Sequence, residues 1–168
     1  CILYMSSVDE CEEFKRIIEE VMMRYHYVKY WIEEITNGVK EKKRRMILQD
    51  FQREEEEDVM RFLLSVRILD EGIDIPAIQN AVILASTGNP RQFIQRRGRI
   101  LRPHPGKTQA TLFDMIVMPP DLDRETWEVE RSLLRRELKR LLEFADLADN
   151  NLEAKEILAK LQLRYGLL

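Results

Sequence analysis

The sequence predicts an α/β fold, a doubly wound parallel sheet followed by a C-terminal helical extension. Short apolar runs bounded by turn residues alternate with longer amphipathic segments through the first 120 residues. This alternation is typical of a parallel sheet with right-handed crossovers. Beyond that point the sequence has only helical patterns. We therefore predict two domains, an α/β domain over residues 1–120 and a helical extension over residues 121–168.

The composition is that of a soluble globular protein with a sizeable core. The chain has 168 residues, 45% hydrophobic and 34% charged, and no apolar run approaches the roughly 20 residues that a membrane helix needs. The net charge of −3 argues against nucleic-acid binding by bulk electrostatics, so any such contact should be local. Two cysteines and two histidines, in neither metal-ligand nor redox spacing, predict no metal site and reduced thiols in the cytoplasm. Because the chain opens at Cys1 and not at a methionine, we expect it to be part of a longer protein.

Five apolar runs are the predicted strands. They lie over residues 2–6, within 28–35, and over 59–66, 81–86 and 110–117. The second run closes at Asn37 and Gly38, which are common turn residues.

Capping signals and helical spacing predict the helices. Ser7, with Glu10 three residues later, fits a capping box and predicts a helix to about residue 23. A second helix is expected over residues 40–52. Its inward-facing residues are predicted to be Met46, Ile47, Leu48 and Phe51.

Three more helices are predicted in the rest of the chain. Asn89 and Pro90 begin one of them, since proline suits the first helical position. Two others are expected over residues 123–146 and 151–165, and we assign them no chemistry.

An arginine-rich segment around Gly98 is the strongest candidate for chemistry. Arginines occupy positions 96, 97, 99 and 102. Arg99 and Arg102 are three residues apart, so they share a helix face. Two guanidinium groups on one face form a fork suited to phosphate oxygens. Taken alone, a solvated basic helix explains this segment better.

A second segment changes that interpretation. Residues 70–76, DEGIDIP, precede the arginine segment and are separated from it by one predicted strand. The pairing, order and spacing resemble motifs V and VI of superfamily 2 helicases and translocases, over residues 1 to about 118. The first strand and its helix resemble motif IV, and ITNGV resembles the segment between motifs IV and V. The matching positions are Gly72, Ile73 and Asp74 for motif V, and Gln95, Arg96, Gly98, Arg99 and Arg102 for motif VI.

The resemblance implies a second, RecA-like motor domain that completes an ATP site. Arg99 and Arg102 would be arginine fingers that reach the γ-phosphate, where phosphoryl transfer spreads negative charge. Gln95 would sense the nucleotide or link to the opposite domain, and Arg96 would brace motif VI against motif V.

The resemblance also implies roles in the first motifs. Asp74 would approach the ribose or order the site through Gly72. Ser7 and Ser65 are the candidate contacts to nucleic-acid phosphates, although each also reads as a cap or a strand-end residue. The family often has Thr before this motif, where Val66 stands here.

The cofactor implied is ATP with magnesium, held mainly by an N-terminal RecA-like domain of the same protein. The stretch PGKT, residues 105–108, is not a phosphate loop, because the first glycine of that motif would fall on Leu101. We therefore expect residues 1–168 alone to be inactive as an ATPase. The motif V sequence favours DNA over RNA and resembles DNA-repair helicases and restriction-enzyme motor subunits, with no membrane partner.

Two other interpretations explain parts of the sequence. A non-catalytic RecA-fold interaction module would use the C-terminal helices as its partner surface, but it would not need both Arg99 and Arg102. A small-molecule-binding α/β domain would need a glycine-rich loop after the first strand, and the sequence has none there.

Overall fold

The computed structural model describes residues 1–53, 58–66, 75, 78–84, 98, 100–116, 118 and 127–167. These residues form two compact units, Cys1–Met115 and Ile116–Leu168. The domain boundary predicted after residue 120 stays a prediction, because residues 119–126 lie outside the described part of the chain.

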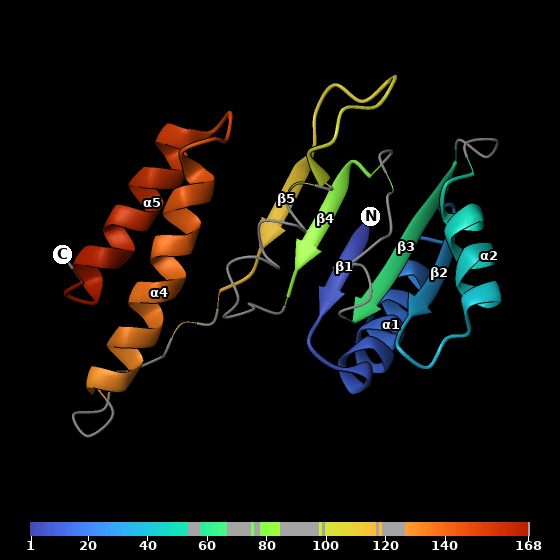
Figure 1. Ribbon diagram of the computed structural model, residues 1–168, viewed down its shortest axis with the longest axis horizontal. Helices are drawn as coiled ribbons and strands as arrows, with labels where there is room; N and C mark the ends of the chain where they lie inside the picture. Colours follow the sequence, from blue (N-terminus) through green and yellow to red (C-terminus); the bar gives the residue numbers. More distant parts are fainter. Residues whose placement is uncertain are drawn as a thin grey trace. The chain divides into compact units, whose positions relative to one another are not determined.

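Unit 1 is built on a five-stranded, all-parallel sheet (Figure 1), which confirms the predicted fold class. The strand order is β2-β3-β1-β4-β5. The strands are β1 (Ile2–Met5), β2 (Lys29–Ile35), β3 (Val59–Val66), β4 (Asn80–Ile83) and β5 (Thr111–Asp114). All five predicted strands are therefore present, with ends shifted by a few residues.

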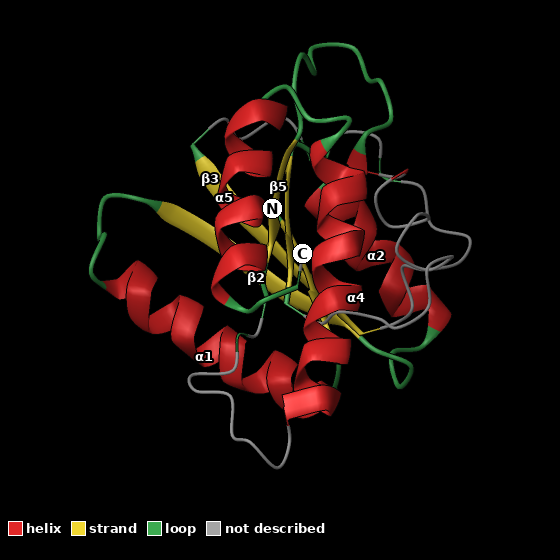
Figure 2. Ribbon diagram, turned by 90° about the vertical axis from the view of Figure 1, so that its left-hand side faces the viewer, coloured by secondary structure: helices red, strands yellow, loops and turns green. Residues whose placement is uncertain are grey.

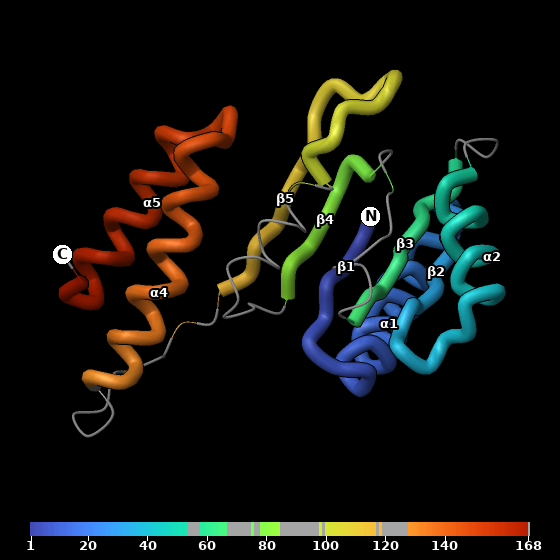
Figure 3. The backbone as a smooth tube through the Cα atoms, in the orientation of Figure 1, coloured from blue at the N-terminus to red at the C-terminus, as the bar shows by residue number. Residues whose placement is uncertain are grey.

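Strand β1 is the centre of the sheet and pairs on both sides. Leu3 lies opposite Leu64 of β3 and Val82 of β4, and every residue of β1 is buried. A strand covered on both faces and both edges must be apolar throughout. The backbone path shows all five strands running the same way, so their carboxyl ends meet at one edge of the sheet (Figure 3).

Helices α1 (Val8–Met23) and α2 (Glu41–Phe51) cover opposite faces of the sheet (Figure 2). The chain passes from β1 over β3 to β2, and then returns from β2 to β3. These two crossovers run in opposite directions, and right-handedness places their helices on opposite faces. On the inner side of α1, Cys11, Phe14 and Ile18 pack against the cluster of Leu3, Met5, Leu64 and Val66.

Helix α2 buries a narrower stripe than its sequence predicts. Ile47 is buried, whereas Met46 is 55% exposed, so the predicted inward position of Met46 is wrong. Successive helical residues are about 100° apart, and the inward side follows Ile47 and Phe51 at i and i+4. Phe51 packs on Trp31 of β2, with ring centroids 6.0 Å apart.

Unit 2 is a pair of helices, α4 (Trp127–Ala145) and α5 (Asn151–Arg164). Its core consists of Leu134, Leu138, Ala145, Leu158, Tyr165 and Leu167. The Arg131 guanidinium donates to the carbonyl oxygen of Gly166, a residue with φ of +58° that ends the hairpin. Among the described helices of both units, none has the length and apolar character needed to cross a bilayer.

The interior position of β3, which pairs with β2 on one side and β1 on the other, generates a stability prediction. Leu64 is 0% exposed, whereas Met60 on the same strand is 49% exposed. We expect Leu64→Ala to lower the free energy of unfolding by about 2–5 kcal/mol, because it leaves a cavity in the core. Met60→Ala, the matched control, should cost less than about 1 kcal/mol. Urea unfolding followed by circular dichroism measures both, and equal losses would contradict the burial described here.

Candidate functional site

The structure describes some of the predicted site residues and not others. Ser7, Ser65, Gly98 and Arg102 lie in the described part of the chain. The remaining predicted positions lie outside it and stay predictions: Gly72, Ile73, Asp74, Gln95, Arg96 and Arg99.

Ser7 lies where β1 ends, at the carboxyl edge of the sheet, and it caps α1. Its hydroxyl oxygen accepts a hydrogen bond from the Glu10 backbone N–H at 3.2 Å, which confirms the predicted cap. The Glu10 carboxylate reaches back mainly to Ser6, the residue before the cap. It accepts from the Ser6 backbone N–H at 2.8 Å and from the Ser6 hydroxyl at 2.6 Å. Ser6 is therefore a member of the cap that the sequence pattern did not identify.

This cap constrains any phosphate contact at Ser7. The Ser7 oxygen is engaged as an acceptor, so its hydroxyl proton remains the group that can be donated to a ligand. The neighbouring Glu10 keeps its negative charge, because the Ser6 hydroxyl first and the Ser6 backbone N–H second lower the pKa of that carboxyl. An anion approaching Ser7 therefore meets a carboxylate. The nucleic-acid role of Ser7 stays a prediction.

Ser65 lies inside the sheet, in β3 between Ile35 of β2 and Tyr4 of β1. It is 0% exposed, and its hydroxyl oxygen has no hydrogen-bond partner among the described residues. A buried hydroxyl left unpaired costs about 1–3 kcal/mol. In this conformation the hydroxyl does not reach the surface, so a phosphate contact would require its surroundings to open. The nucleic-acid role of Ser65 also stays a prediction.

The arginine segment ends in a helical turn anchored by one apolar residue. Gly98 and Ile100 are helical, Ile100 is 0% exposed, and Arg102 is exposed two residues later. Among the described residues, a Cβ atom added to Gly98 would meet nothing within 4 Å, and Gly98 does not adopt positive φ. Within the described part of the chain, neither space nor backbone conformation therefore requires glycine at this position.

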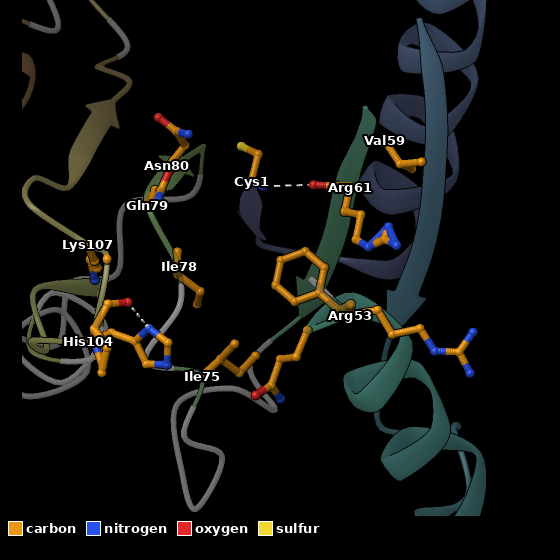
Figure 4. Close-up of a pocket in the computed structure, with 14 residues that line it drawn as sticks. Cys1, Arg53, Val59, Arg61, Ile75, Ile78, Gln79, Asn80, His104 and Lys107 are labelled. Carbon is orange, nitrogen blue, oxygen red and sulfur yellow. Dashed lines mark hydrogen bonds between the residues drawn. The ribbon is translucent and has the colours of Figure 1, made fainter. Parts of the chain in front are cut away.

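The turn after Arg102 lies at the amino edge of the sheet, opposite the edge that carries Ser7. There it borders a hollow of about 520 Å³ (Figure 4), which is also lined by residues where β1, β3 and β4 begin. The charged side chains of this lining are Arg53, Arg61 and Lys107, with His104 beside them. The structure therefore separates Ser7 from Arg102 and places them at opposite edges.

The described residues form neither a cluster of potential metal ligands nor a site with a reactive thiol. Within them, no three His, Cys, Asp or Glu side chains gather as potential metal ligands. Cys1 and Cys11 are both free thiols. Burial first, and the charges of Glu34 and Glu10 second, raise the pKa of Cys11 to about 11, so this thiol is a core residue and not a nucleophile.

The Glu10 cap generates a prediction on pH. A carboxyl whose folded-state pKa is lowered stabilises the fold above its unfolded pKa, and this contribution is lost as pH falls through the folded value. We therefore expect the start of α1 to fray on acidification below about pH 4. Amide hydrogen exchange at residues 8–11 against pH measures this, with Glu10→Gln as the control. A pH dependence that persists in Glu10→Gln would assign the effect to another group.

Comparison with known proteins bears on most of unit 1. The family model for the helicase conserved C-terminal domain matches residues 1–104. The DNA 3'-5' translocase XPB2 of Sulfurisphaera tokodaii is 30% identical over 111 residues, covering 58% of this chain and 24% of the relative. This chain therefore corresponds to about a quarter of that relative's length.

A solved structure has the same fold. It is an ATP-dependent Type ISP restriction-modification enzyme, LlaBIII, bound to DNA. The similarity has a TM-score of 0.62 at 23% sequence identity and covers 88% of this chain and 11% of that chain. The parallel sheet, its strand order and the match over residues 1–104 lead to one conclusion. The chain belongs to the helicase conserved C-terminal domain family, as the second RecA-like domain of a superfamily 2 helicase or translocase.

Proposed function

We propose that this domain is one half of an ATP-driven DNA motor and that Arg99 and Arg102 stabilise the transition state of ATP hydrolysis. The observation that carries the proposal is the extent of the family match, residues 1–104, which includes the whole arginine segment. The ATP and its magnesium would be held mainly by an N-terminal RecA-like domain of the same protein. ATP hydrolysis would supply the free energy for movement along DNA.

The described helix end supports a role for Arg102 at an interface. Ile100 is buried in the core, while Arg102 is exposed two residues later. Burial of Ile100 thus fixes the backbone at this point, while the Arg102 side chain stays exposed. A cation held in this way can meet charge that develops on a phosphate supplied by another domain. Arg99, three residues earlier, would share the same helix face.

The nucleotide would meet further residues of this chain. Gln95 and Arg96 would lie near its phosphates, while Asp74 would approach the ribose and Gly72 would let the backbone come close. Magnesium ligands are expected from the N-terminal domain.

Gly98 adds a second line of support. Glycine in a helix costs about 1 kcal/mol relative to alanine. With respect to the residues that the structure describes, a Cβ at Gly98 would fill open space. The reason for glycine here would then lie outside the domain, in a surface that approaches the helix closely when the ATP site is assembled.

DNA is the proposed track. The relative that is 30% identical is described as a DNA translocase, and the solved structure with the same fold is bound to DNA. With a net charge of −3, this domain would contribute local contacts, by Ser7 and Ser65, and not a broad basic surface.

The arginine assignment generates the central prediction. In the full-length protein, Arg99→Ala or Arg102→Ala should lower kcat about 10³- to 10⁵-fold, the usual worth of an arginine finger. The KM for ATP should change little, because these groups act on charge that develops only in the transition state. Steady-state ATPase assays with saturating DNA measure both constants.

Arg97→Ala is the matched control, since helical spacing would place position 97 on a different face from positions 99 and 102. It should retain most of the activity. Equal losses at positions 97, 99 and 102, or losses that follow unfolding, would show that the segment is a structural basic face. Unchanged kcat at positions 99 and 102 would favour a non-catalytic interaction module instead.

Gly98→Ala generates an independent prediction. The added methyl group should leave the melting temperature unchanged or raise it slightly, because alanine favours the helix. The same change should lower kcat, since the methyl group obstructs the approaching surface. Differential scanning fluorimetry and ATPase assays on one preparation provide both readouts. Full activity in Gly98→Ala would remove this line of support.

A further inference from the structure

We infer that Lys107 is a positioning residue, which fixes the backbone of the helical turn that ends the arginine segment and so sets where the Arg102 side chain can reach. The inference rests on the proposed function of Arg102. It concerns the stretch PGKT, which sequence analysis excluded as a phosphate loop.

The contacts of Lys107 converge on the end of that helix. Its Nζ donates to the carbonyl oxygen of Ile100 and, at 3.0 Å, to the carbonyl oxygen of Arg102. The last carbonyl groups of a helix have no partners within the helix, and a cation at this end also interacts favourably with the helix dipole. One ammonium group therefore joins the buried anchor, Ile100, to the residue proposed to act on ATP.

The turn that carries Lys107 is held in shape locally. The Lys107 backbone N–H donates to the His104 carbonyl at 3.0 Å. Pro105 occupies the second turn position and Gly106, with φ of +81°, the third, as a type II turn requires. The His104 ring nitrogen Nδ1 lies 2.9 Å from the Pro105 carbonyl oxygen (Figure 4). The turn over residues 104–107 thus brings the Lys107 side chain back to the carbonyl groups of Ile100 and Arg102.

The surroundings of Lys107 differ from those of an ordinary surface lysine. The side chain is half-buried at the amino edge of the sheet. Desolvation by burial lowers the pKa of its ammonium group. A charge kept in such a place needs hydrogen-bond acceptors, and the two carbonyl groups supply them.

The consequence for catalysis is geometric. An arginine that meets a transition state must be placed to within about 0.5 Å. Without the ammonium group, the carbonyls of Ile100 and Arg102 would turn to water and the final turn would fray. Arg102 would then sample positions away from the phosphate, although its own chemistry would be intact.

The experiment uses the full-length protein and three variants. Lys107→Met keeps the apolar stem and removes the donors, Lys107→Arg restores donors, and Lys160→Met removes an exposed lysine of α5 as the matched control. We expect Lys107→Met to lower kcat about 10- to 100-fold, the cost of a misplacement of about 1 Å. The KM for ATP and the melting temperature should stay close to those of the wild type. Lys107→Arg should recover part of kcat, and Lys160→Met should match the wild type.

A double variant separates the two proposals. If Lys107 acts through Arg102, Lys107→Met should cost little further activity in an Arg102→Ala background. Independent, multiplicative losses would overturn the positioning role, as would a kcat for Lys107→Met equal to that of the wild type, or a loss that follows the melting temperature. A normal kcat for Arg102→Ala alone would instead overturn the proposed function of Arg102.

Discussion

The parallel pairing of β1 with both β3 and β4 is the constraint on which the rest of unit 1 depends. It forces the central strand to be apolar throughout, and right-handed crossovers then place α1 and α2 on opposite faces. It also places the polar residues of the two candidate surfaces at opposite edges of the sheet. The chain leaves β1 through Ser6 and Ser7 at the carboxyl edge, and it enters β5 through the Lys107 turn at the amino edge. The parallel arrangement of the strands therefore places one polar surface at the carboxyl edge of the sheet and another at the amino edge.

The two surfaces are organised by different electrostatics. At the carboxyl edge, the Glu10 carboxylate is held against the start of α1 by Ser6. At the amino edge, the Lys107 ammonium group is held against the helical turn that ends the arginine segment, by the carbonyl oxygens of Ile100 and Arg102. Each charge complements the helix terminus beside it. These two helix ends are therefore fixed by side-chain charges as well as by the core, which matters most where a helix end carries a residue proposed to act in catalysis.

An arginine that serves a site in another domain has to satisfy two opposing needs. It must be exposed before the domains meet, yet its backbone must be as fixed as the core. Here Ile100 and Arg102 meet both needs within three residues, one buried and one exposed. If Arg102 acts as proposed, such an arrangement would give half of a site little activity of its own and would make hydrolysis depend on domain closure. Coupling of ATP hydrolysis to movement along DNA would use this dependence.

The order of strands and helices and the Ser7 cap were predictable from sequence, because alternating apolar runs and capping residues act over a few neighbouring positions. The arginine segment was also recognisable from its sequence, although the structure describes only its end. Tertiary structure decided which residues are buried and which groups meet. Met46 is exposed beside buried Ile47, Ser65 is enclosed by two strands, and Lys107 folds back on Arg102. These outcomes depend on strand order and turn geometry, which bring together residues that no local pattern connects.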